Sequence, residues 1–496
     1  MLLYDKETVY RLDQAAVHHD GLVEIELMHR AGQRVWRAIG ERWPSVSRIT
    51  VFAGSGNNGG DAYVVALLAR EQGVEVQLIS RGELSRQSET SAHFSERWQQ
   101  AGGEIQPWSR QEITGELIVD GLLGIGLSRP LDDEAQSVIQ GINACPVPKI
   151  AIDIPSGLNA NTGVAQPCAV LAALTVTFIG EKVGHYLADG PDYCGELIFD
   201  DLGVSSQTRA SEPPALEVID SGSLMLPVRR KRNSHKNQFG HVLIIGGDRG
   251  MSGATMLAGT TALRAGAGMV SVLVHPECVH SLSAAPELMV ESWDEIERKL
   301  EQTNIVLVGP GLGQSKAAKS CLQKLQSSNK PLVVDASALE ATFLGALASD
   351  QVVITPHPGE AGSLLSITSK AVQADRMEAS RQLVDTFEVV SVLKGAGTLV
   401  QQKGSTPAIN VRGNPGMAVA GMGDVLAGLI AALMAQNLPA LEAAKSAVLI
   451  HALGAEAYAL DNDETGLIAS DITQRIPRIM KELRNTTSPI QYADQG

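Results

Sequence analysis

VFAGSGNNGGDAYVVALLAR, residues 51–70, runs from an apolar, β-branched segment through a glycine-rich loop into an apolar helical pattern. A strand, a tight loop and a helix in this order form the first part of a βαβ unit. Gly54, Gly56 and Gly59 have the spacing of a dinucleotide-binding fingerprint, in which glycines let the backbone approach a phosphate. The stretch therefore predicts an α/β fold, and one match to this spacing leaves the ligand undecided.

The residues around these glycines depart from those of a dehydrogenase. Such an enzyme places an acidic residue about 20 positions further on, at the end of the second strand, to bind a ribose hydroxyl. Residues 78–81, Leu-Ile-Ser-Arg, occupy that place, and Glu83 comes slightly late. The pair Asn57–Asn58 and the following Asp61 are also unusual, so hydride transfer is disfavoured.

Composition limits the class of protein. A chain of 496 residues with 44% hydrophobic and 19% charged residues is globular and long enough for two domains. The formal net charge of −15 counts against nucleic-acid or anionic-membrane partners, and no apolar stretch is long enough to span a bilayer. The charged N-terminus is unlike a signal peptide, so we expect a cytoplasmic protein. Five scattered cysteines suggest reduced thiols without a metal framework: Cys145, Cys168, Cys194, Cys278 and Cys321.

Short apolar strands alternate with helices in both halves of the chain, which predicts parallel sheets covered on both faces. A long helical segment over residues 12–40 opens the first half. The polar, proline-bearing stretch 205–232 separates the halves, giving domains over residues 1–215 and 225–496. Its basic run 229–232 is interpreted as a solvated linker rather than a nucleic-acid arm.

Three strand ends of the first domain carry oxygen-bearing side chains. Asn58, Asp120 and Ser156 each follow a predicted strand, and the carboxyl ends of parallel strands share one edge of the sheet. Together they could bind a cation through oxygen atoms. Alternatively, Asn58 and Ser156 could only cap helices, and the spacing does not separate the two interpretations.

The strongest signal in the second domain is GNPGMAVAGMGDVLAG, residues 413–428. Gly421 and Gly423 precede a long apolar helix, so backbone amides can bind an anion beside the carboxylate of Asp424. This combination suits phosphoryl transfer to an alcohol, with Asp424 as the base. The turn at 394–398 and His357 could contact a ligand, although the turn also suits a plain hairpin and the histidine could simply bond backbone.

GSGNNGGDAYVVA, VDGLLGIGLSRPL and AIDIPSGLNANTG, from roughly residues 10–210, resemble the NAD(P)HX epimerases, which interconvert the two forms of hydrated nicotinamide cofactors. Ala62 stands where we expect a glycine. The resemblance implies a Rossmann-like three-layer domain, a potassium ion on Asn58, Asp120 and Ser156, and a substrate contact at Asp153. It further implies NAD(P)HX contacts at Asn57, Asn58, Gly59, Gly60, Asp61, Gly124, Ile125, Gly126, Leu127, Ser128, Arg129 and Pro130. Inverting the carbon that bears the hydroxyl needs a proton donor or acceptor near the ring, and Asp153 is the ionisable candidate for this catalytic role once Asp120 binds the cation.

The second half resembles the ribokinase-like NAD(P)HX dehydratases through HVLIIGGDRGMSGATMLAGTTALRAGAGMVSV, VGPGLGQS, ITPHPGEA, LKGAGTLV and NPGMAVAGMGD, across nearly all of residues 225–485. Ala420 and Asn237 replace glycines usual in that family. The resemblance implies a ribokinase-like α/β domain with Asp424 as its catalytic residue. It implies nucleotide contacts at Lys394, Gly395, Ala396, Gly397, Thr398 and Gly423, and NAD(P)HX contacts at Ala254, Gly313, His357 and Asp424.

By this resemblance we expect a bifunctional NAD(P)H-hydrate repair enzyme. It would epimerise (R)- and (S)-NADHX and NADPHX, and convert the S form to NAD(P)H with ADP and Mg²⁺, releasing AMP and phosphate. We expect a homo-oligomer that acts on small molecules and binds neither nucleic acid nor membrane. The alternatives are a vitamin or sugar kinase with a regulatory or nucleotide-binding N-terminal domain, and a non-catalytic first domain.

Overall fold

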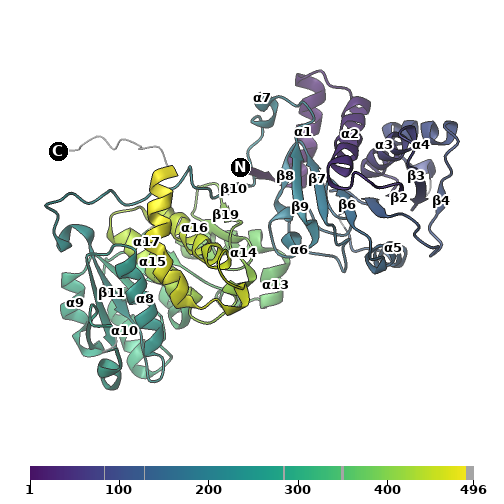
Figure 1. Cartoon of the computed structure of the whole chain (residues 1–496). Helices are drawn as coiled ribbons and strands as arrows, with labels where there is room; N and C mark the ends of the chain where they lie inside the picture. The colour runs from purple at the N-terminus through teal and green to yellow at the C-terminus, as the bar shows by residue number, and fades with distance from the viewer. Residues whose placement is uncertain (83, 128, 283–284, 348–350, 487–496) are drawn as a thin grey trace. The chain divides into compact units, whose positions relative to one another are not determined.

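A computed structural model describes residues 1–82, 84–127, 129–282, 285–347 and 351–486 (Figure 1). The chain divides into two compact units, Leu2–Leu216 and Glu217–Gly496 together with Met1. Each unit contains its own sheet and its own buried apolar core. The mixed α/β fold with parallel sheets that the alternating sequence pattern predicts is confirmed.

The N-terminal unit is built on a seven-stranded sheet in which every pair of neighbours is parallel. From edge to edge the strands are β4 (Gln106–Pro107), β3 (Glu75–Ser80), β2 (Arg48–Ala53), β5 (Leu117–Gly121), β6 (Lys149–Ile152), β7 (Leu174–Phe178) and β9 (Glu196–Asp200). β1 (Leu2–Tyr4) pairs in parallel with β8 (Glu181–Lys182).

Helices cover both faces of this sheet, because neighbouring strand residues point to opposite sides. Val51 and Val119 pack in one core with α2, α3 and α4, whereas Phe52 and Ile118 pack with α5 in another. Figure 1 shows α2–α4 on one side of the sheet and α5 on the other, which makes three layers. The helices are α1 (Lys6–His19), α2 (Glu24–Arg42), α3 (Asn57–Glu71), α4 (Glu89–Gln100), α5 (Asp133–Ala144), α6 (Gly190–Cys194) and α7 (Ser206–Arg209).

The predicted helical segment 12–40 is two helices in the structure. α1 ends at His19, and α2 begins at Glu24. Gly21 lies between them with a φ of +67°, a left-handed conformation that interrupts a helix and that glycine adopts at little cost. The sequence pattern therefore found the helical character but missed the break.

The C-terminal unit has a mixed sheet, parallel from β13 to β17 and antiparallel on both sides of β18. Its order is β13 (Met289–Ser292), β12 (Met269–Val274), β11 (His241–Ile245), β14 (Ile305–Val308), β15 (Leu332–Val334), β16 (Val352–Ile354), β17 (Val390–Leu393), β18 (Thr398–Gln401), β19 (Ala408–Asn410) and β10 (Leu216–Val218). The turn at residues 394–397 joins β17 to β18 as a hairpin.

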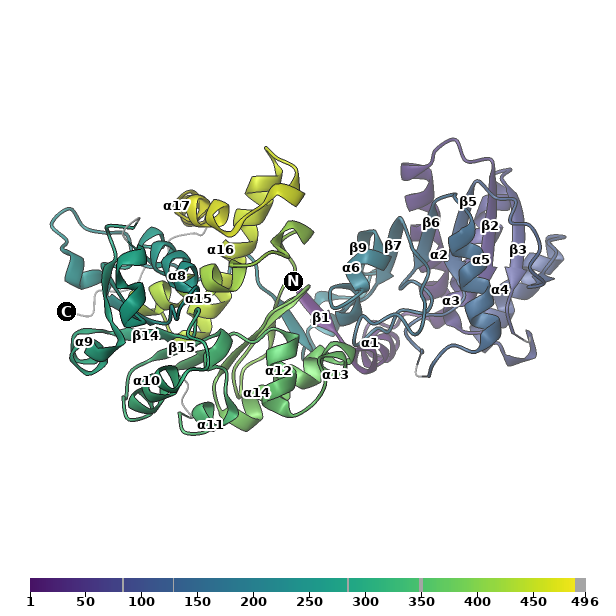
Figure 2. The same cartoon turned by 90° about the horizontal axis from the view of Figure 1, so that it is seen from below.

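One face of this sheet packs against α8 and α15–α17 in a large apolar core. α15 is buried along almost its whole length, as its apolar sequence predicts. Figure 2 shows α10–α12 and α14 on the opposite face. The helices are α8 (Ser252–Arg264), α9 (Ile296–Gln302), α10 (Lys316–Gln326), α11 (Ala341–Leu344), α12 (Pro358–Leu365), α13 (Ser369–Ala374), α14 (Arg376–Phe387), α15 (Met422–Ala435), α16 (Ala440–Ala459) and α17 (Ala469–Thr486).

Among the described residues, no helix combines the length and the apolar character that a membrane crossing requires.

Candidate active sites

The glycine-rich loop after β2 packs tightly against the neighbouring strand end. A Cβ atom on Gly54 would lie 1.9 Å from the carbonyl oxygen of Leu122, and one on Gly59 would lie 2.0 Å from the carbonyl oxygen of Gly54. Only glycine fits at these two positions. The glycines therefore bring the start of α3 close to the loop that follows β5.

This close approach gathers the three predicted cation ligands. The Ser156 amide donates to Asp120 Oδ2 at 2.8 Å, and the Ser156 hydroxyl donates to Asp120 Oδ1 at 2.6 Å. Asn58 Nδ2 donates to the Leu123 carbonyl at 3.0 Å, and Ser156 also bonds Leu123. These contacts place Asn58 and Ser156 in one polar cluster, and no side chain caps α3, which begins after Gly56.

The cluster has the properties of a cation site. Asn58 Oδ1 is buried and has no hydrogen-bond partner among the described residues. Burial raises the pKa of Asp120 to about 6, and its bonds to Ser156 and Leu122 only partly oppose this. A buried acceptor without a donor beside a buried carboxylate fits a bound cation such as potassium.

A cavity of about 1090 Å³ lies beside this cluster and takes in most of the predicted substrate residues. Gly59 and Gly60 pack instead against the Gly54 backbone and Met28, and Ser128 lies outside the described residues. The predicted residues that line the cavity are Asn57, Asn58, Asp61, Gly124, Ile125, Gly126, Leu127, Arg129, Pro130 and Asp153.

The same cavity holds a cluster of charged side chains. Lys182, from β8, forms an ion pair with Asp153. Burial raises the pKa of Asp13 to about 7, with Lys182 opposing and Asp153 adding to the rise. Burial, followed by the Asp153 and Asp13 carboxylates, raises the pKa of Asp61 well above its ordinary value. Carboxyl groups of different proton affinity in one cavity are typical of acid–base sites.

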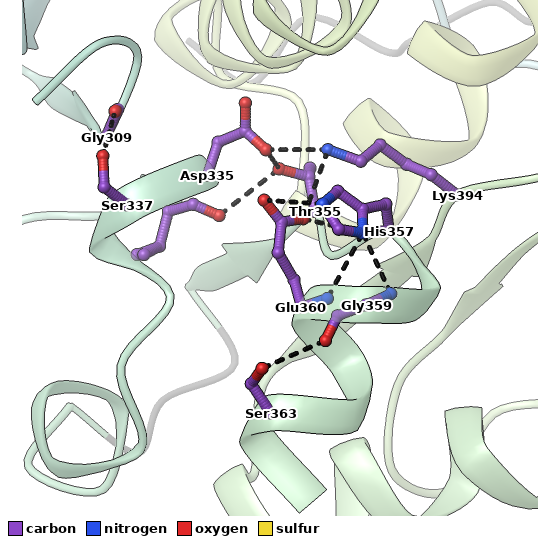
Figure 3. A network of polar contacts seen from close by, with 10 residues as sticks. Gly309, Asp335, Ser337, Thr355, His357, Gly359, Glu360, Ser363 and Lys394 are labelled. Carbon is purple, nitrogen blue, oxygen red and sulfur yellow. Dashed lines mark hydrogen bonds and ion pairs between the residues drawn. The ribbon is translucent and has the colours of Figure 1, made fainter. Parts of the chain in front are cut away.

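The second site lies where the β17–β18 hairpin meets strand ends of the C-terminal sheet (Figure 3). Lys394 Nζ donates to Asp335 Oδ1 at 3.0 Å and lies 3.8 Å from Glu360 Oε2. The hydroxyl of Thr355 donates to the same Asp335 oxygen at 2.7 Å. Burial lowers the pKa of Lys394, but the Asp335 and Glu360 carboxylates outweigh it and the pKa is raised. Lys394 therefore remains an ammonium.

The first turn of α15 brings Asp424 to this group. Gly421 precedes the helix with a φ of +91°, and a Cβ atom on Gly423 would lie 3.3 Å from Lys394 Nζ. Burial and then the Asp335 carboxylate raise the pKa of Asp424 to about 6, against the effect of Lys394. Asp424 is thus a carboxylate beside an ammonium and a helix N-terminus, which can act as a base next to an anion-binding site.

A buried arginine shapes the predicted nucleotide segment. Arg376 donates hydrogen bonds to the carbonyl groups of Leu393, Lys394 and Gly397 at 3.2–3.3 Å. Burial lowers its pKa to about 10. Gly395 has a φ of +141° and lies so close to the guanidinium that a side chain would not fit. Gly395 and Ala396 are exposed, and Thr398 bonds the Gly395 carbonyl at 2.9 Å.

The remaining predicted contacts lie on surrounding loops. His357 caps α12, since its Nδ1 accepts from the Gly359 and Glu360 amides at 2.9 and 3.2 Å. The backbone-bonding role that the sequence left open is therefore present, while the imidazole remains largely exposed. The Gly313 amide donates to Ser337 at 3.0 Å. Ala254 lies in the first turn of α8, one turn before Leu257, which contacts Gly421.

Two family descriptions match this chain in the order of its two units. Residues 24–184 match YjeF-related protein N-terminus, and residues 242–478 match NAD(P)H-hydrate dehydratase. The bifunctional NAD(P)H-hydrate repair enzyme Nnr of Coxiella burnetii is 40% identical over 477 residues, covering 95% of this chain and 98% of that protein.

The chain belongs to the bifunctional NAD(P)H-hydrate repair enzymes.

Another member of these repair enzymes, from Escherichia coli K12, is 38% identical and covers 96% of this chain and 93% of its own length. A ribokinase-like superfamily protein of Enterococcus faecalis has 28% identity and a TM-score of 0.50, covering 55% of this chain and 98% of that chain. The repair-enzyme family and the ribokinase-like fold expected from the sequence are confirmed. A small-molecule kinase with a regulatory domain is the less supported alternative.

Sequence reasoning missed several charged residues at both sites of this repair-enzyme chain. Asp335 ends the predicted strand PLVVDAS, and Glu360 follows the motif at His357, so their positions carried a usable signal. Lys182 follows the predicted strand LTVTFIG in the same way. Asp13 and Arg376 lie within helices and contact the sites only through the tertiary fold, so no local pattern marks them.

Proposed function

We propose that the N-terminal unit epimerises NADHX and NADPHX, and that the C-terminal unit dehydrates the S form with ADP as phosphoryl donor. The dehydratase part of this proposal rests on the close approach of Asp424 and Gly423 to Lys394. Fusion of the two activities is useful, because a dehydratase that accepts one epimer depends on an epimerase for the other. We further propose a cytoplasmic homo-oligomer.

In the epimerase cavity, the loop residues 124–127 and 129–130 and the start of α3 would bind the dinucleotide. Asp153 is the proposed acid–base group for the ring hydroxyl. Asn58, Asp120 and Ser156 would hold a potassium ion, and the unpartnered Asn58 Oδ1 supports this assignment. The ion would supply positive charge beside Asp120 and the substrate phosphates.

In the dehydratase site, Asp424 would accept the proton of the ring hydroxyl while the hydroxyl oxygen attacks the terminal phosphorus of ADP and releases AMP. Lys394 and the amides at the start of α15 would stabilise the charge of the transferred phosphoryl group. Phosphate is a better leaving group than hydroxide. Loss of phosphate with a proton from the adjacent carbon restores the ring double bond and gives NAD(P)H.

Magnesium would bind chiefly through the phosphates of the donor. The described residues contain no group of three or more His, Cys, Asp and Glu that could hold a metal ion by themselves. Mg²⁺ commonly uses one or two carboxylates together with substrate phosphates. Asp335 and Glu360, which flank Lys394, fit this requirement and would supply those carboxylates.

The test is incubation of hydrated cofactor with ADP or with ATP, while the absorbance of reduced nicotinamide and the release of inorganic phosphate are followed. We expect both to rise together with ADP. A stable phosphorylated product without recovered absorbance would instead support the kinase alternative. No recovery with either donor would refute the dehydratase assignment, and unchanged R-to-S ratios would refute the epimerase assignment.

A further inference from the structure

The environment of Asp153 is built around the buried side chain of Lys182. The Lys182 side chain is 1% exposed, and its ammonium group contacts three acceptors. One is Asp153 Oδ1, and the others are the Thr177 hydroxyl at 2.9 Å and the Phe178 carbonyl at 3.1 Å. With three acceptors for three N–H groups, Lys182 is fixed in place and fully paired.

All side-chain contacts of Asp153 in the described part of the chain fall on one oxygen. Oδ1 accepts from Lys182, from the Thr177 hydroxyl at 3.1 Å and from the Phe178 amide at 3.3 Å. Oδ2 has no such contact, and the side chain is 16% exposed and lines the cavity. One carboxylate oxygen is therefore held by the protein while the other is available to a ligand.

The backbone at Asp153 is fixed as firmly as the side chain. Its φ is +64°, a left-handed conformation that non-glycine residues rarely adopt. His185 Nδ1 accepts from the Lys182 amide at 3.3 Å, so its Nε2 carries the proton and donates to the Asp153 carbonyl at 3.0 Å. Burial and then the Lys182 ammonium lower the pKa of His185 to about 4, which keeps the imidazole neutral.

We infer that Lys182 is a positioning residue that anchors Asp153 Oδ1 and so holds Oδ2 toward the cavity, where Oδ2 takes and returns the proton of the substrate's ring hydroxyl. The inference rests on the proposed epimerase function. The titratable groups that face this pair are Asp13 and Tyr10 from α1, Asp61 from α3, and His185.

One base is enough for this reaction. Hydration of an enamine places the hydroxyl on the carbon bonded to the ring nitrogen. When Asp153 Oδ2 takes the hydroxyl proton, the oxygen forms a C=O bond and the C–N bond breaks, with its electron pair delocalised from nitrogen into the conjugated carboxamide. After rotation of the aldehyde, nitrogen adds to its other face and Asp153 returns the same proton to oxygen. No oxidant or second proton donor is required.

The test compares R-to-S exchange of NADHX by the wild-type chain and by Lys182→Met. We expect a roughly 10²–10⁴-fold lower kcat with a nearly unchanged KM, because the base is displaced while the rest of the cavity still binds substrate. Lys149→Met is the matched control, since Lys149 bonds only the Cys145 carbonyl among the described contacts. Dehydration of S-NADHX by the same chains checks the other unit.

Thr177→Val provides a milder variant in case Lys182→Met does not fold. It removes one hydrogen bond from Asp153 and one from Lys182, so kcat should fall by a smaller factor with KM again nearly unchanged. A folded Lys182→Met or a folded Thr177→Val with the wild-type kcat would overturn the inference. Failure of the wild-type chain itself to exchange the epimers would instead refute the underlying epimerase function.

Discussion

Each unit of the chain contains a lysine–aspartate pair with one buried partner, but the two pairs are used differently. Lys182 pairs with Asp153, the residue proposed to act on the substrate. Lys394 pairs with Asp335, whereas the proposed base is the neighbouring Asp424, whose pKa rises to about 6. Lys182 bonds the proposed base directly and fixes its position. Lys394 instead bonds Asp335, which after burial is the second cause of the raised pKa of Asp424.

Asp424→Asn should have the largest effect, and on one unit alone. Loss of the base should lower ADP-dependent dehydration by about 10²–10⁴-fold, because no other carboxylate would replace it. Epimerisation should be unchanged, since Asp153 belongs to the other unit. Both rates can be measured on one preparation with S- and R-NADHX. Dehydration by the variant at the wild-type rate would show that Asp424 is not the base.

Asp335→Asn removes the carboxylate that pairs with Lys394 and tests its effect on Asp424. Because Asp335 raises the pKa of Asp424, its removal should move the acidic limb of the dehydratase pH–rate profile below pH 6. Breaking a buried pair should also lower the free energy of unfolding by up to about 3–5 kcal/mol. Glu360→Gln, 3.8 Å from Lys394, is a control with a smaller expected effect. An acidic limb that stays near pH 6 would show that Asp335 does not raise the pKa of Asp424.

Potassium should stabilise the N-terminal unit more at pH 8 than at pH 5. The pKa of Asp120 is raised from 3.8 to about 6 in the folded state, so the stability associated with its proton is present below pH 4 and lost as pH rises through 6. A bound cation would offset that loss, by about 2.7 kcal/mol at a hundredfold excess over Kd.

Melting temperatures in potassium chloride and tetramethylammonium chloride measure this effect. Asp120→Asn should remove the difference between the two salts, and the epimerase rate should follow the same pattern. Equal melting temperatures and equal rates of the wild-type chain in both salts would exclude the cation from this unit.

The smallest effect is expected from Thr355→Val, which removes one hydrogen bond to Asp335 without changing any charge. The free energy of unfolding should fall by about 1 kcal/mol. The dehydratase profile should keep its shape, because the Lys394–Asp335 pair remains. Urea unfolding and the profile can be measured together, and a profile displaced as far as in Asp335→Asn would contradict the role given to the charge.

The sequence predicted the positions that depend on strand ends. Asn58, Asp120 and Ser156 each lie at or shortly after the end of an apolar strand, and a parallel sheet brings such ends together. Charge partners are different, because they are set by pairing between distant segments. Lys182 reaches Asp153 from 29 residues away, and Lys394 reaches Asp335 from 59 residues away.

Two further features that the sequence did not predict concern the local conformation of single residues. Asp153 follows its strand as predicted, but nothing in the sequence indicates a left-handed backbone at an aspartate. For His357 the sequence leaves ligand contact and backbone bonding open, and the structure shows the imidazole capping α12. Which of these residues bind ligand remains a prediction.

The buried Arg376 also determines which backbone groups the exposed hairpin directs outward. A trans peptide points its N–H opposite to its C=O. Since Arg376 draws the Lys394 carbonyl inward, the amide of Gly395 is directed outward, away from the guanidinium. The hairpin thus presents positive backbone polarity, and a negative group would be attracted whichever small residue occupies position 396. An anion bound at this hairpin would therefore depend on an interior arginine that it does not contact.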